Sequence, residues 1–106
     1  MGLDLEALRE AAARGRVQWH QHALERLFER GLTRAEVLRA AVEGEVIETY
    51  AEGRPYASCL LLLLGAAPLH VVAALDAERG VCHIITVYRP DGDHFEADYR
   101  TRRKRR

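Results

Sequence analysis

The sequence has few cysteines, no long apolar run and no excess charge of either sign. Cys59 and Cys82 are the only two cysteines in 106 residues, too few for a disulfide framework, and both are expected as reduced thiols in apolar strands. The longest apolar run, 59–64, is far shorter than the roughly 18 residues of a membrane-spanning helix. Acidic Asp4 and Glu6 stand where a secretory signal would be basic and then apolar. We therefore expect a cytoplasmic protein with no membrane partner.

The net charge is zero, but the charge is unevenly distributed. Six of the sixteen basic residues lie in 100–106, while all sixteen acidic residues precede position 100. The tail therefore carries +6 and the rest of the chain carries 10 − 16 = −6. Contact with a polyanion such as RNA is expected to be local and to begin at the tail, although a disordered solubilising tail is the alternative. The candidate phosphate-binding residues of this tail are Arg100, Arg102, Arg103 and Lys104.

Hydrophobic periodicity predicts three helices followed by four strands. The helices are expected over 5–14, over 21–30 and between Thr33 and Gly44, where Thr33 and Glu36 form a capping box. Short turns between the strands favour an antiparallel meander, and Val17 to Trp19 is expected to be an extended link. The predicted strands are 45–51, 58–64, 69–75 and 81–88. We predict an α+β domain over 1–99, with three N-terminal helices packed on a four-stranded antiparallel sheet, followed by a basic tail over 100–106.

The predicted helix over 21–30 carries the most suggestive polar residues. His22, Arg26 and Arg30 are spaced by four and lie on one helical face. A histidine that exchanges a proton beside an arginine that binds phosphate can support acid–base cleavage of RNA. The alternative is an ordinary solvated face. The opposite face is predicted to be buried through Ala23, Leu24, Leu27 and Phe28.

The last predicted strand ends in a second group of polar residues. Strict alternation places Thr86 and Tyr88 on the same face as Cys82 and Ile84, with Arg89 at the strand end. A tyrosine and an arginine at this position can stack on a base and bind phosphate, although a strand end that reaches water is the alternative. His70 on the neighbouring strand is either a core histidine or a member of the same surface.

A metal centre is disfavoured by the spacing of its possible ligands. Zinc sites usually contain close ligand pairs on turns, whereas these residues are scattered over separate predicted strands and a helix. No cofactor and no metal ligand is therefore predicted. The residues considered are His20, His22, Cys59, His70, Cys82 and His83.

Several segments together resemble a bacterial family of small domains, domain of unknown function 4258. The segments are His22-Ala23-Leu24-Glu25-Arg26 with Arg30-Gly31-Leu32-Thr33, Gly44-Glu45-Val46-Ile47-Glu48, Arg54-Pro55-Tyr56 with Ser58-Cys59-Leu60, Pro68-Leu69-His70-Val71-Val72, and Ile84-Ile85-Thr86-Val87-Tyr88-Arg89-Pro90-Asp91. The resemblance covers nearly all of 20–102. The family commonly has Ser or Thr two places before the helix histidine, where this chain has His20.

More distantly, the order of helices and sheet is similar to that of the RelE/BrnT group of toxins from toxin–antitoxin pairs. This likeness implies metal-independent RNA cleavage, on or off the ribosome, and a cognate antitoxin as partner. Mechanisms that need several lysines do not transfer, because Lys104 is the only lysine.

The leading hypothesis is an endoribonuclease toxin in which the 2′-OH attacks the adjacent phosphate. His22 or His70 would move the proton, Arg26 and Arg89 would hold the phosphate, and Tyr88 would stack or donate. The alternative is a non-catalytic module of the same fold that binds a protein or a nucleic acid.

Overall fold

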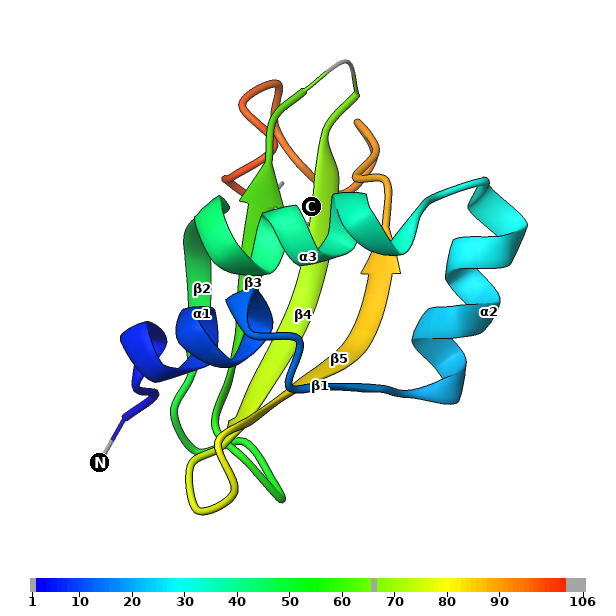
Figure 1. The fold of residues 1–106 in the computed structure, drawn as a ribbon. Helices are drawn as coiled ribbons and strands as arrows, with labels where there is room; N and C mark the ends of the chain where they lie inside the picture. Colours follow the sequence, from blue (N-terminus) through cyan, green and yellow to red (C-terminus); the bar gives the residue numbers. More distant parts are fainter. Residues whose placement is uncertain (1, 66, 103–106) are drawn as a thin grey trace.

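The computed structural model describes residues 2–65 and 67–102 and contains three helices and one five-stranded sheet in those residues. Figure 1 shows α1 and α3 across one face of the sheet and α2 beside β5, with the chain after β5 returning near the ends of the central strands. Among the described helices, none is long and apolar enough to cross a membrane. The elements are α1 (Leu5–Ala13), β1 (Val17–Trp19), α2 (Gln21–Arg30), α3 (Arg34–Glu43), β2 (Glu45–Tyr50), β3 (Ser58–Leu63), β4 (Leu69–Asp76) and β5 (Val81–Tyr88).

The helix boundaries follow local signals in the sequence. Asp4 accepts a hydrogen bond from the backbone N–H of Ala7 at 3.0 Å and caps α1. Thr33 and Glu36 form the predicted capping box of α3. Gly31 ends α2 with a φ of 64°, a left-handed conformation that glycine adopts without steric cost. His20 precedes α2 and makes no capping side-chain hydrogen bond.

The prediction of four antiparallel strands is wrong in one element. The strand order is β1-β5-β4-β3-β2, and three of the four pairings are antiparallel as predicted. Val17–Trp19, expected as a link, instead pairs in parallel with β5, with Val17 opposite Cys82 and Trp19 opposite Ile84. A segment of three residues is too short to show the alternation that predicts a strand. Val17–Trp19 becomes a strand only because it pairs with the distant strand β5.

A bulge in β5 overturns the predicted alternation of its side chains. Ala73 pairs with Ile84, but Val72 pairs with Thr86, so Ile85 is one residue extra. Cys82, Ile84 and Val87 belong to the core that the helices cover, so Thr86 and Tyr88 lie on the opposite face of the sheet. The bulge therefore moves both polar side chains away from the helix-covered face and onto the face where the C-terminal segment lies.

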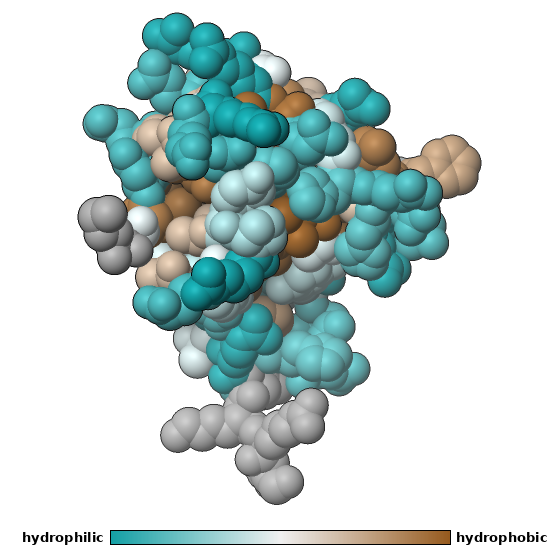
Figure 2. Space-filling view, turned by 90° about the horizontal axis from the view of Figure 1, so that it is seen from below, coloured by the Kyte–Doolittle hydropathy of each residue, from teal (hydrophilic) through white to brown (hydrophobic). Residues whose placement is uncertain are grey.

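The predicted apolar stripe of α2 is only partly correct. Ala23 and Leu27 are buried, but Phe28 is 91% exposed and Leu24 is only half-buried. Because α2 lies beside the sheet edge and not across its face, it buries a narrower stripe than α1 and α3 do. Figure 2, the view from below, shows a mainly hydrophilic surface with separate apolar patches between the polar side chains.

Both cysteines are buried and free, as predicted. Burial raises the pKa of the Cys59 thiol to about 11 and that of the Cys82 thiol to about 12. We expect a thiol reagent at pH 8 to modify the native protein on the timescale of unfolding, and the denatured protein at once, because only the thiolate reacts. Rapid modification of one equivalent in the native state would contradict the burial of these residues.

Candidate functional site

A pocket of about 400 Å³ lies between α2, the end of β5 and the segment that follows β5. Seven of the polar residues singled out in the sequence line it, which brings together side chains that are more than 60 positions apart in the chain. Four arginines and one aspartate line the pocket, and three of the arginines form ion pairs with glutamates that lie outside the lining. The lining residues are His22, Arg26, Arg30, Thr86, Tyr88, Arg89, Pro90, Asp91, His94, Phe95 and Arg102.

Helix α2 supplies His22, Arg26 and Arg30 from one face, as their spacing of four predicts. Arg26 makes an exposed ion pair of 3.1 Å with Glu29 on the same helix, an interaction that is weak in water. The side chains of His22 and Arg30 make no hydrogen bond or ion pair with any other described residue. These two side chains are therefore free to engage a ligand.

His70 lies beneath the pocket and does not line it. Its side chain is fully buried, with Nε2 at 2.8 Å from the carbonyl oxygen of Tyr99 and Nδ1 at 3.1 Å from the hydroxyl of Tyr88. A carbonyl can only accept, so Nε2 carries the proton and Nδ1 accepts from the Tyr88 hydroxyl. Burial lowers the pKa of His70 and favours this neutral form. His70 thus fixes Tyr88 at the pocket wall, and the rings of His70 and Phe95 lie nearly perpendicular with their centres 4.6 Å apart.

Arg89 lines the pocket but is anchored to the scaffold. Its guanidinium donates to the carbonyl oxygens of Ala67 and Pro68 at 3.1 and 3.3 Å, and it forms an ion pair of 3.4 Å with Glu36. These bonds tie the end of β5 to the turn before β4 and to α3. Arg89 therefore has fewer donors available for a phosphate than the sequence prediction assumed.

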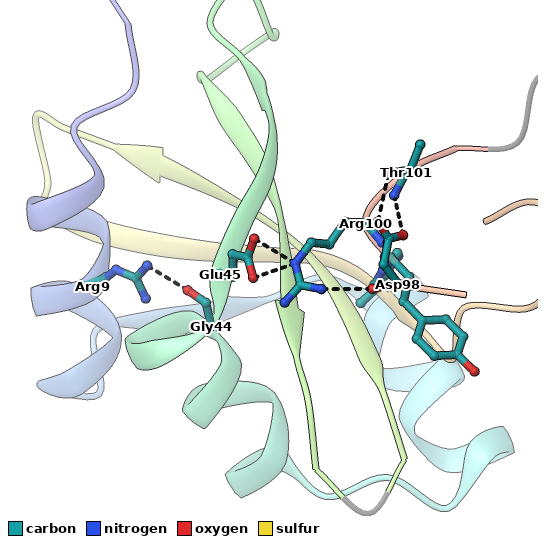
Figure 3. A network of polar contacts seen from close by, with 8 residues as sticks. Arg9, Gly44, Glu45, Asp98, Arg100 and Thr101 are labelled. Carbon is teal, nitrogen blue, oxygen red and sulfur yellow. Dashed lines mark hydrogen bonds and ion pairs between the residues drawn. The ribbon is translucent and has the colours of Figure 1, made fainter. Parts of the chain in front are cut away.

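The basic C-terminal segment is held against the edge strand β2. Arg102 bonds both carboxylate oxygens of Glu48, at 2.5 and 3.0 Å, and lies over the Phe95 ring. This bonding lowers the pKa of Glu48. Arg100 pairs with Glu45 at 2.8 Å, and Figure 3 shows it reaching across from the C-terminal segment to the start of β2. Of the two proposed tail residues that the structure describes, Arg102 lines the pocket and Arg100 does not. Arg103 and Lys104 lie outside the described residues.

His94 is a pocket residue that sequence analysis did not single out. It follows the turn Pro90-Asp91-Gly92-Asp93, and its Nδ1 lies 2.8 Å from a carboxylate oxygen of Asp91. The same oxygen accepts the backbone N–H groups of Asp93 and His94, and these bonds to His94 lower the pKa of Asp91. The carboxylate orients the ring and leaves Nε2 as the atom that can exchange a proton. Asp91 and His94, three residues apart in a turn, are the signal that could have indicated this pair.

In the part of the chain that the structure describes, no three His, Cys, Asp or Glu side chains are placed to hold a metal ion. His20 and His83 do meet, at 2.9 Å between Nε2 and Nδ1, but this is a hydrogen bond between two rings. What the pocket offers instead is two exposed histidines, several guanidinium groups and a tyrosine hydroxyl around one concave surface. Such groups can move protons and bind an anion.

Fold and site together define a small α+β protein with a pocket lined by arginines and histidines at the edge of its sheet. The chain belongs to the family described as "Domain of unknown function (DUF4258)", which it matches over residues 19–89. That span contains His22, Arg26, Tyr88 and Arg89, but it ends before His94. No curated protein and no solved structure matches the chain, so the likeness to RelE and BrnT toxins stays a prediction.

Proposed function

We propose that the protein is a metal-independent endoribonuclease whose catalytic pocket contains His22 and His94. The observation that supports this proposal is the convergence of these two histidines with four arginines in one pocket of about 400 Å³. RNA cleavage by its own 2′-OH needs a base, an acid and positive charge near the phosphate, and the pocket contains groups for each role.

In the proposed reaction, one histidine removes the proton of the 2′-OH and the freed oxygen attacks the adjacent phosphorus. The bond from phosphorus to the 5′-oxygen breaks, and the second histidine gives that oxygen a proton. The products are a 2′,3′-cyclic phosphate and a free 5′-hydroxyl. Arg30 and Arg26 bind the phosphate, since Arg30 has no other described partner and Arg26 only an exposed ion pair. Tyr88, held by His70, presents its ring to a base.

The proposal is tested by incubating the purified protein with single-stranded RNA, with and without EDTA. We expect cleavage at equal rates in both samples, a cyclic phosphate at the new 3′ end, and no cleavage where the 2′-OH at the scissile position is replaced by hydrogen. Cleavage that stops with EDTA would contradict the metal-independent mechanism.

The second candidate is an RNA-binding module without catalysis. It is favoured by the exposure of His94, whose side chain is 70% exposed and is therefore not enclosed in a water-excluded site. Binding of RNA with no cleavage in the same assay would select this candidate. The toxin role and a cognate antitoxin stay predictions, and co-purification with the product of an adjacent reading frame would test them.

The last four residues, Arg103 to Arg106, carry four positive charges. Their removal leaves Arg100 and Arg102 in their ion pairs with β2, so the fold is expected to persist. If all four contact phosphates, the slope of log K against log salt falls by about 2.8, since each contact on a single strand contributes about 0.7. Fluorescence anisotropy with a labelled RNA at several salt concentrations measures this slope. An unchanged slope would exclude the tail from the RNA contact.

A further inference from the structure

A second, smaller cavity of about 140 Å³ opens on the same sheet face as the pocket. Its floor comes from β3, β4 and β5, through Ser58, Ala74 and Val72 and the bulged residue Ile85. Its wall comes from the turn between β2 and β3 and from His20 before α2. The turn residues in that wall are Gly53, Arg54, Pro55 and Tyr56.

The two cavities are neighbours along β5. Ile85 lines the small cavity and Thr86, the next residue, lines the pocket. Val72 lines the small cavity and pairs across the sheet with Thr86. A ligand that occupies the pocket can therefore continue into the small cavity along the same sheet face, without crossing an edge of the sheet.

Aromatic rings form a fixed side of the small cavity. Tyr56 stacks on His83 with ring centres 4.8 Å apart and an interplanar angle of 29°. His83 in turn bonds His20, with 2.9 Å between Nδ1 and Nε2. Burial lowers the pKa of His83, which favours a neutral ring in this pair. The three rings hold one another in place, so the Tyr56 side chain is positioned before any ligand arrives.

The polar groups around the small cavity are available to a ligand. The guanidinium of Arg54 and the hydroxyl of Ser58 make no hydrogen bond with another described residue, and no acidic residue lines the cavity. A neutral or electron-rich ring with carbonyl oxygens would find donors here. An aliphatic ligand would leave these donors without a partner.

We propose that the small cavity binds a pyrimidine base of the RNA whose phosphate occupies the pocket. This inference rests on the proposed function and adds a substrate preference to it. An enclosed cavity of about 150 Å³ holds one benzene ring, and the small cavity has about 140 Å³, so its size suits a single six-membered ring better than a fused purine. Tyr56 contacts the ring, while Arg54 and Ser58 donate to its carbonyl oxygens.

The test uses three probes that differ in what they place beside the phosphate: inorganic phosphate, uridine 3′-monophosphate and adenosine 3′-monophosphate. NMR titration follows the ring signals of all five histidines. We expect every probe to shift His22 and His94. Only the uridine nucleotide is expected to shift His20 and His83 as well, and to bind at least about fivefold more tightly than the adenosine nucleotide, as one stacked base implies.

Variants separate the two cavities. Tyr56→Ala is expected to reduce uridine nucleotide affinity at least about fivefold and to leave inorganic phosphate binding unchanged. Arg54→Gln changes an exposed residue on the rim and is expected to reduce affinity for the uridine nucleotide without changing the melting temperature. This variant keeps the test decisive if Tyr56→Ala fails to fold. Phe28→Ala is the matched control, because this exposed aromatic ring lines neither cavity.

Equal affinity for both nucleotides, with shifts confined to His22 and His94, would overturn the pyrimidine site and leave the proposed ribonuclease intact. No shift of His22 or His94 with any probe would overturn both. Uridine binding that neither Tyr56→Ala nor Arg54→Gln weakens would also overturn the site.

Discussion

Replacing His94 by alanine is expected to lower the RNA cleavage rate by about 10²–10⁴, the usual loss when a proton carrier is removed. The ring lies at the pocket, and its Nδ1 is held 2.8 Å from Asp91, which leaves Nε2 to act on the substrate. Because the side chain is 70% exposed, its removal is expected to change stability by no more than about 0.5 kcal/mol. Rates from single-turnover cleavage and melting temperatures from calorimetry separate the two effects.

Matched controls make this result specific. Asp93→Ala alters an exposed residue of the same turn that does not line the pocket, and full activity is expected. His22→Ala is expected to reproduce the loss, whereas Gln21→Ala beside it on α2 is not. Asp91→Asn keeps the shape but removes the charge that orients His94, so a smaller loss is expected. Cleavage by the His94→Ala variant at the wild-type rate would exclude His94 from catalysis and return the proposal to His22 alone.

Local patterns were sufficient to predict much of this molecule. The capping box at Thr33 and Glu36 and the spacing of His22, Arg26 and Arg30 depend on neighbours within one or two helical turns, so the sequence reports them directly. The apolar run 59–64 belongs to a predicted strand, and the corresponding strand β3 lies between β2 and β4 with four of its six residues buried.

The features that sequence analysis missed depend on contacts between distant residues. β1 is a strand only because Val17 and Trp19 reach β5, more than 60 positions away. The bulge at Ile85 reverses the side-chain alternation, and no residue type in this segment predicts a bulge. Arg102 resembles a free phosphate ligand in the sequence, yet it pairs with Glu48, 54 positions earlier. His94 looks like a polar residue in a turn until the fold places that turn opposite α2.

For His70, a role in the core and a role as proton carrier predict different contacts for its ring. The sequence allowed either a core histidine or a proton carrier, and the site geometry favours the first. Its ring is fully buried, both nitrogens are hydrogen-bonded, and it faces Tyr88 across the sheet in direct register. A proton carrier needs a nitrogen that reaches the substrate, and the two bonds to Tyr88 and Tyr99 leave His70 with none.

The effect of His70→Ala should therefore appear in stability. The variant creates a cavity and leaves the Tyr99 carbonyl without its donor, which together are expected to lower the free energy of unfolding by about 3 kcal/mol. For a domain of this size, that change lowers the melting temperature by about 12 °C or more. Tyr88→Phe is the matched control, because it removes only one hydrogen bond and is expected to lower the free energy of unfolding by about 1 kcal/mol.

The same residue predicts a pH dependence whose sign can be worked out. Burial lowers the pKa of His70 below its ordinary 6.5, so the unfolded chain takes up a proton at a higher pH than the folded protein does. Stability is complete above about pH 6.5 and falls as the pH drops toward the folded pKa, by at most about 1.4 kcal/mol per pH unit. Below the folded pKa this contribution no longer changes.

Chemical denaturation at pH 7.5, 6.5 and 5.5 should show this loss of stability in the wild type and a smaller loss in His70→Ala, where the contribution of His83 remains. Equal pH dependence in both proteins, with similar melting temperatures, would mean that His70 is not the buried neutral support of Tyr88 and would restore it as a candidate proton carrier.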